Sequence, residues 1–97
     1  MPVPNRRARN QRKVAILAAL ERERKGFAPA GWVTPAGLWA RHFIARASLR
    51  NIYVGLKRYL RWNLVEQRRS GSGRLMYRIT QKGQERLQWL SKYAHQR

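Results

Sequence analysis

The sequence of 97 residues contains no cysteine and only four acidic residues, all of which are glutamate. The absence of cysteine excludes disulfides and thiolate metal sites, and it leaves the redox compartment open. The two histidines, His42 and His95, have no cysteine or aspartate anywhere in the chain to complete a metal site. We therefore interpret both as packing or surface residues, and we expect no metal and no cofactor.

Long apolar runs are also missing. The longest covers residues 14–20, far fewer than the roughly 18 to 20 residues that cross a bilayer, so we expect no membrane partner. The arginine-rich start resembles a transit peptide in lacking acids, but Glu21 and Glu23 follow and no cleavage-site pattern is evident. We interpret this segment as part of the fold and expect a cytoplasmic or nucleoid-associated protein.

Positive charge dominates the composition. The chain has 22 Lys and Arg against four acids, which gives a formal net charge of +18 and a pI near 12.0. Such a field favours a polyanionic partner, either nucleic acid or an anionic membrane surface. Most of the cations are arginine, whose planar fork binds phosphate or guanine in a bidentate way, although genome base composition or thermal adaptation explains that bias equally well.

The length fits a single domain with a basic arm in front of it. Residues 1–9 contain two prolines and no apolar periodicity, so we predict a flexible basic N-terminal arm, and residues 10–97 form the domain. A first helix is predicted from the N-cap Asn10 to just before Gly26, and a loop from Gly26 to Val33. Thr34 and Pro35 then predict a capped short helix that ends near His42.

A third helix is predicted over residues 48–62, with Leu56 at the centre of its buried side. Steps of about 100° per residue place five further apolar side chains beside it: Leu49, Ile52, Tyr53, Tyr59 and Leu60. The opposite side carries Arg50, Asn51, Val54, Lys57, Arg58 and Arg61. An ordinary solvated face usually mixes charges of both signs, and here no acid occurs between Glu23 and Glu66. Gly55 within this helix indicates either close approach of another backbone or simple tolerance.

Two strands with a glycine-containing tip are predicted after this helix. Asn63 suits the left-handed conformation that ends a helix, and residues 64–69 and 74–80 read as strands on either side of Gly71 and Gly73. Apolar and cationic residues alternate along the second strand. The predicted hairpin therefore carries arginines near its tip and edge, namely Arg68, Arg69, Arg74 and Arg78.

The order of these segments resembles the winged helix-turn-helix domain of the MarR-like and PadR-like transcriptional regulators. The residues that carry the resemblance are Leu38, Ile44, Leu49, Ile52 and Leu56, the stretches 56–60 and 64–66, and Tyr77 to Gly83 with Leu87. It covers residues 10 to 93, and the strand that ends in Thr80, Lys82 and Gly83 is its most specific part. Phe43 departs from the pattern by replacing the usual glycine of the turn, and Trp39 is an addition.

The resemblance implies an α+β, mainly α fold with a three-helix core, a two-stranded β-wing and a C-terminal helix. It also implies a small transcriptional regulator that reads the DNA major groove with the helix 48–62 and grips the backbone or minor groove with the wing 64–80. The DNA-binding residues expected in the recognition helix are Arg46, Ser48, Arg50, Asn51, Val54, Lys57, Arg58 and Arg61. Those expected in the wing are Arg68, Arg69, Ser72, Arg74 and Arg78, and those in the arm are Arg6, Arg7 and Arg9.

Other functions stay open to different degrees. The alternative is a sequence-tolerant architectural, replication-accessory or RNA-binding protein, which the charge favours. A catalytic tyrosine is not expected because the chain is short and has no cluster of acidic partners, and residues 71–73 lack the pattern of a phosphate-binding loop, so we expect no enzyme. Trp89 and Tyr93 in the last predicted helix are candidates for a homodimer contact or for packing in a monomer.

Overall fold

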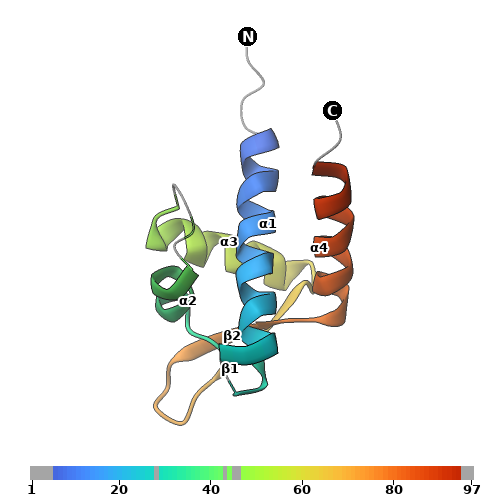
Figure 1. Cartoon of the computed structure of the whole chain (residues 1–97). Coiled ribbons are helices and arrows are strands. Elements are labelled where there is room, and N and C mark those ends of the chain that lie inside the picture. Colours follow the sequence, from blue (N-terminus) through green and yellow to red (C-terminus); the bar gives the residue numbers. More distant parts are fainter. Residues whose placement is uncertain (1–5, 28, 43, 45–46, 95–97) are drawn as a thin grey trace.

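The arrangement of helices and strands is taken from a computed structural model that describes residues 6–27, 29–42, 44 and 47–94 (Figure 1). Within these residues the fold is α+β and mainly helical. Its elements in chain order are α1 (Arg6–Arg22), a π-helical turn (Glu23–Phe27), a 3-10 turn (Pro29–Gly31), α2 (Pro35–His42), α3 (Leu49–Arg61), β1 (Val65–Arg69), β2 (Leu75–Ile79) and α4 (Gln81–Ala94).

The first helix begins earlier than its sequence pattern predicts. We expected a flexible arm through residue 9 and a helix from Asn10, but α1 begins at Arg6, so that part of the arm prediction is wrong. Residues 6–9 contain no glycine or proline, and arginine and alanine are good helix formers. At the other end, the π-helical turn runs from the end of the predicted helix into the predicted loop, which also contains the 3-10 turn, and Ala30 and Gly31 adopt left-handed backbone with φ of 53° and 81°.

Local hydrogen bonds set the ends of α2 and α3 as predicted. The Thr34 hydroxyl accepts from the Gly37 amide at 3.0 Å, and Pro35 is the first residue of α2. The Ser48 hydroxyl accepts from the Asn51 amide at 3.1 Å and caps α3. Asn63 ends α3 with a left-handed φ of 61°, and the Leu64 amide donates to the Tyr59 carbonyl at 2.9 Å.

The hairpin agrees with its predicted strands to within one residue. β1 and β2 pair antiparallel, with Val65 opposite Ile79 and Arg69 opposite Leu75. Val33 adds a third position to the sheet on the free edge of β2, because its amide donates to the Tyr77 carbonyl at 3.0 Å and the Tyr77 amide returns a bond at 2.8 Å. The loop before α2 is thereby fixed to the hairpin.

The core lies where α1 and α4, which run antiparallel side by side, meet α3 and the sheet (Figure 1). Its buried members include Ile16, Leu17, Leu20, Val33, Leu38, Ile52, Leu56, Tyr59, Leu64, Val65, Tyr77, Ile79 and Leu90. Tyr53 was expected in the core, and this expectation is wrong because its side chain is 40% exposed on the flank of α3. Gly55 is buried at the α1 crossing, where an added Cβ would lie 3.2 Å from the Ile16 side chain rather than near another backbone.

A compact joint connects the end of α3 to the start of α4. The Thr80 hydroxyl accepts from the Gly83 amide at 2.9 Å and donates to the Asn63 carbonyl at 2.7 Å. Gly83 packs directly on the Leu64 carbonyl, and a Cβ at this position would overlap that oxygen. Among the helices of the described residues, none has the length and apolar character to cross a membrane.

Candidate nucleic-acid interface

The solvent side of α3 presents a row of cations. Arg50, Val54, Lys57 and Arg61 follow one another at helical spacing and are exposed, and Val54 is 49% exposed. Arg58 is exposed on one flank, beside the half-buried Asn51. We call these six residues the α3 basic face. Like charges such as Lys57 and Arg61 at i, i+4 destabilise a helix by roughly 0.2–0.5 kcal/mol, so this arrangement does not serve the stability of α3.

The acidic residues lie elsewhere and are mostly occupied. Glu21 accepts two hydrogen bonds from Arg24, which lower the pKa of its carboxyl, and Glu66 pairs with Arg78 at 3.0 Å. Glu23 is fully buried against α2. Within the described part of the chain, no ion pair involves a cation of the α3 basic face, so its charge is not neutralised by the protein.

The hairpin arginines separate into anchored and projecting side chains. The Arg68 and Arg78 guanidinium carbons lie 4.4 Å and 4.7 Å from the centroid of the Trp32 ring, which is only 8% exposed. Arg78 also donates to Glu66 through Nε at 3.0 Å. These two arginines therefore hold the hairpin against the loop before α2, with Trp32 between them and the core.

The tip of the hairpin is closed by short polar contacts. The Ser70 amide donates to the Arg74 carbonyl at 2.8 Å, Gly73 has a left-handed φ of 86°, and the Ser70 and Ser72 hydroxyls are 2.9 Å apart. Arg69 donates to the Gly73 carbonyl at 2.8 Å. Arg74 is exposed at the tip. Of the four hairpin arginines, Arg74 is the one whose guanidinium makes no hydrogen bond, ion pair or ring contact to a described residue.

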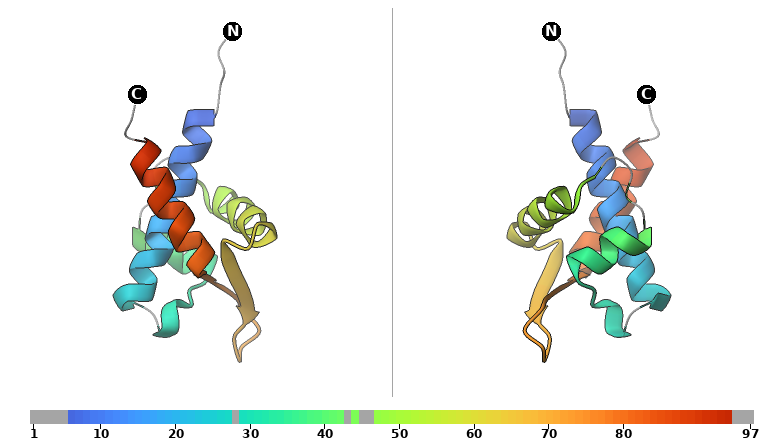
Figure 2. Two further views of the ribbon diagram at one scale, coloured as in Figure 1. Left: turned by 90° about the vertical axis from the view of Figure 1, so that its right-hand side faces the viewer. Right: turned by 90° about the vertical axis from the view of Figure 1, so that its left-hand side faces the viewer.

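The hairpin and α3 project from the same side of the molecule, while α1 and α4 lie behind them (Figure 2). The α3 basic face and the hairpin tip therefore belong to elements on the same side of the molecule. Ser48 borders the α3 basic face, but its hydroxyl is engaged as the cap of α3. Arg6, Arg7 and Arg9 lie in the first turns of α1. Arg46 and the turn residue Phe43 lie outside the described residues.

Several contacts near this region have no signal in the sequence pattern. Trp39 donates from its indole nitrogen to the Ala47 carbonyl at 3.0 Å, which fastens α2 to the start of α3. Lys13 lies 4.7 Å from the centre of the Trp62 ring at the far end of α3. Trp89, the candidate dimer residue, is 52% exposed on α4. Lys13 and Trp62 are distant in sequence, and the bond from Trp39 to Ala47 joins two different elements, so helical periodicity does not reveal either contact.

No protein-family model matches the sequence, and comparison with curated proteins gives no significant match.

Proposed function

We propose that this protein is a winged helix-turn-helix protein that binds double-stranded DNA, and that it acts as a small transcriptional regulator. The observation that carries the proposal is the α3 basic face, whose exposed cations have no acidic partner among the described residues and lie on the same side of the molecule as a projecting hairpin. In this proposal α3 lies in the major groove, with Arg50, Asn51 and Val54 toward the base edges. Lys57, Arg58 and Arg61 contact backbone phosphates, and the hairpin follows the adjacent backbone or minor groove.

The hairpin contacts are divided among its arginines. Arg74 at the tip is free to contact a phosphate directly, because its side chain is exposed and has no bond to a described residue. Arg68 and Arg78 support the hairpin through Trp32 and Glu66. Arg78 is thus assigned to positioning rather than to a phosphate, which refines the role expected from the sequence.

A second candidate is a sequence-tolerant DNA- or RNA-binding protein. It is favoured by the net charge of +18 and by the composition of the α3 basic face, where the one side-chain amide, Asn51, is half-buried. Arginine and lysine contacts to phosphates carry no sequence information. Such a protein binds every duplex with similar affinity.

The two candidates are separated by selecting from a pool of random duplexes and then titrating the selected and unselected DNA by fluorescence anisotropy across a salt series. A regulator prefers the selected sequence by about 10³-fold or more, and equal affinities at physiological salt contradict it. Arg50→Ala is expected to reduce this preference, since bidentate base contacts contribute about 1–3 kcal/mol of discrimination. Lys57→Gln serves as the matched control, because it should weaken binding to both duplexes equally and reduce the salt slope by about one. Absence of salt-dependent binding to any duplex would contradict both candidates.

A further inference from the structure

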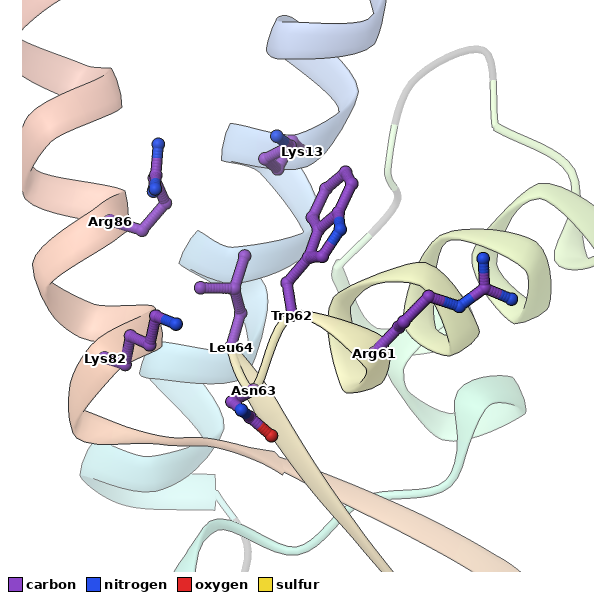
Figure 3. A pocket seen from close by; sticks show the side chains of 7 residues that line it. All are labelled: Lys13, Arg61, Trp62, Asn63, Leu64, Lys82 and Arg86. Atoms are coloured by element: carbon purple, nitrogen blue, oxygen red, sulfur yellow. The ribbon is translucent and has the colours of Figure 1, made fainter.

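A hollow of about 490 Å³ lies between α1, the end of α3 and α4 (Figure 3). Its volume falls within the range of about 300–1,000 Å³ that is usual for small-molecule sites. The residues that line it are Lys13, Arg61, Trp62, Asn63, Leu64, Lys82 and Arg86. Figure 3 shows Lys13, Lys82 and Arg86 arranged around Leu64 and Trp62, while the Arg61 side chain extends away on the other side of Trp62.

The walls of this hollow are held by the joint between α3 and α4. Asn63 ends α3 in a left-handed turn, and Thr80 bonds both to that turn and to the first turn of α4. Gly83 packs against the Leu64 carbonyl, which brings the start of α4, with Lys82 and Arg86, to the hollow on the side of Leu64 opposite Trp62. Lys82 and Arg86 are therefore positioned by the contacts of this joint.

The charge of the hollow is of one sign. None of its lining residues is acidic, and three of them direct positive groups toward the same space. Burial lowers the pKa of Lys13, and repulsion from Arg86 and then Arg58 lowers it further. The Trp62 ring, whose centroid lies 4.7 Å from the Lys13 Nζ, attracts this charge only weakly because the site is partly exposed. The positive charge of the hollow therefore favours an anion as its ligand.

The combination of groups indicates the kind of anion. Lysine acts as a point charge and arginine as a planar fork, and both bind the tetrahedral oxygens of a phosphoryl group well. Trp62 is 43% exposed and offers a flat apolar wall beside these cations, suited to a nucleobase or sugar. We infer that the hollow binds one nucleotide unit, with its phosphoryl group against Lys13, Lys82 and Arg86 and its organic part beside Trp62.

The proposed phosphoryl contacts, Lys13, Lys82 and Arg86, lie outside the α3 basic face, which shares Arg61 with the lining of the hollow. The nucleotide unit has two sources, a free mononucleotide or the backbone of a bound nucleic acid. Both present the same phosphoryl chemistry to Lys82 and Arg86.

The test uses the full chain and follows the NMR signal of the Trp62 indole N–H, assigned by its loss in Trp62→Phe. The signal is titrated at constant ionic strength with adenosine 5′-monophosphate, adenosine and a short DNA. We expect a saturable shift with the monophosphate and none with adenosine. Lys82→Gln and Arg86→Gln should each weaken this binding about tenfold. Lys82→Arg should retain it, and Lys25→Gln, at an exposed position outside both the hollow and the α3 basic face, should leave it unchanged.

The two possible sources of the nucleotide unit are distinguished by which ligand shifts the Trp62 signal. Saturation by the monophosphate identifies a free nucleotide as sufficient. A shift with DNA alone, weakened by Lys82→Gln and Arg86→Gln, assigns the phosphoryl group to a nucleic-acid backbone. The inference is overturned if neither ligand shifts the Trp62 signal, if adenosine does so as well as its monophosphate, or if both charge-removing variants bind like the wild type. Duplex binding by the α3 basic face is measured separately through Arg50→Ala and Lys57→Gln, so failure of one proposal is distinguishable from failure of the other.

Discussion

Glu23 is a carboxylate inside the core, and its two oxygens are both occupied. One accepts from Arg41 Nη1 and the other contacts His42 Nε2, each at 2.7 Å, and the Glu23 side chain is fully buried. These two contacts join the turn after α1 to the last turn of α2. Because the two partners lie 18 and 19 residues away in sequence, the residues around Glu23 do not indicate that its carboxylate is buried and paired.

We expect Glu23→Ala to lower the free energy of unfolding by about 3–5 kcal/mol, because it removes the fully buried carboxylate that both Arg41 and His42 contact. Urea unfolding followed by circular dichroism measures the change. Glu66→Ala is the control, since the Glu66 pair with Arg78 is partly exposed and exposed pairs contribute about 0–1 kcal/mol. Equal losses in the two variants would contradict a buried role for Glu23.

The Tyr59 phenol makes part of the free energy of unfolding depend on pH in the alkaline range. Burial in the core raises the pKa of Tyr59 to about 12. In the unfolded chain the phenol ionises near its ordinary pKa of about 10, so between these values the unfolded state binds fewer protons than the folded state. This contribution to stability is therefore complete below about pH 10 and is lost as the pH rises toward 12.

Tyr59→Phe should remove that loss. Urea midpoints of the wild type and the variant, measured from about pH 8 to about pH 11, are expected to converge as the pH rises, with the wild type losing up to about 1–2 kcal/mol relative to the variant. The difference between the two proteins isolates Tyr59 from the other groups that titrate in this range. A constant difference at all pH values would show that the Tyr59 phenol keeps its ordinary pKa.

Among the elements, the hairpin shows most clearly which contacts have a local signal. Its strands, its tip and the Asn63 turn were predictable because each depends on neighbouring residues and on backbone preferences. The anchoring of Arg68 and Arg78 on Trp32 was not, because Trp32 is more than thirty residues away in sequence. Tyr53 was misassigned for a related reason, since helical periodicity gives the direction of a side chain but not the width of the surface that packs against it.

The same division applies to the candidate sites. The residues of the α3 basic face were predictable because all lie on a single helix with regular spacing. The nucleotide hollow was not predictable, because Lys13, Trp62 and Arg86 come from three helices that meet only in the folded chain. A helix start at Arg6 was also missed, since both Asn5 and Asn10 are residues favoured at an N-cap and the apolar periodicity begins only after Asn10.

The hairpin arginines should differ in their effect on binding and on stability. We expect Arg74→Ala to weaken binding to all duplexes equally and to reduce the salt slope by about one, without changing the urea midpoint, because the Arg74 side chain is exposed and its guanidinium contacts no described residue, while its two hydrogen bonds to Ser70 are made by the backbone. Arg78→Ala should instead lower the free energy of unfolding by about 1 kcal/mol through loss of its contacts with Glu66 and Trp32. If Arg74→Ala left both affinity and salt slope unchanged, the hairpin would not contact the nucleic acid.

For the molecule as a whole, net charge opposes folding. Eighteen excess positive charges repel one another more strongly in the compact state than in the unfolded chain. Raising the salt concentration from about 0.1 M to about 1 M shortens the Debye length from about 10 Å to about 3 Å. We therefore expect the urea midpoint to rise over a sodium chloride series, and a constant or falling midpoint would show that repulsion does not limit stability.

The joint at Thr80 restricts how the protein adapts to a ligand. One hydroxyl bonds both the end of α3 and the start of α4, and Gly83 leaves no gap at Leu64. The end of α3 is therefore tied directly to the start of α4. In the proposed DNA complex, this joint helps to fix the angle at which α3 meets the groove, and we expect the hairpin tip, which lies beyond the Trp32 anchor, to adapt to differences in groove width.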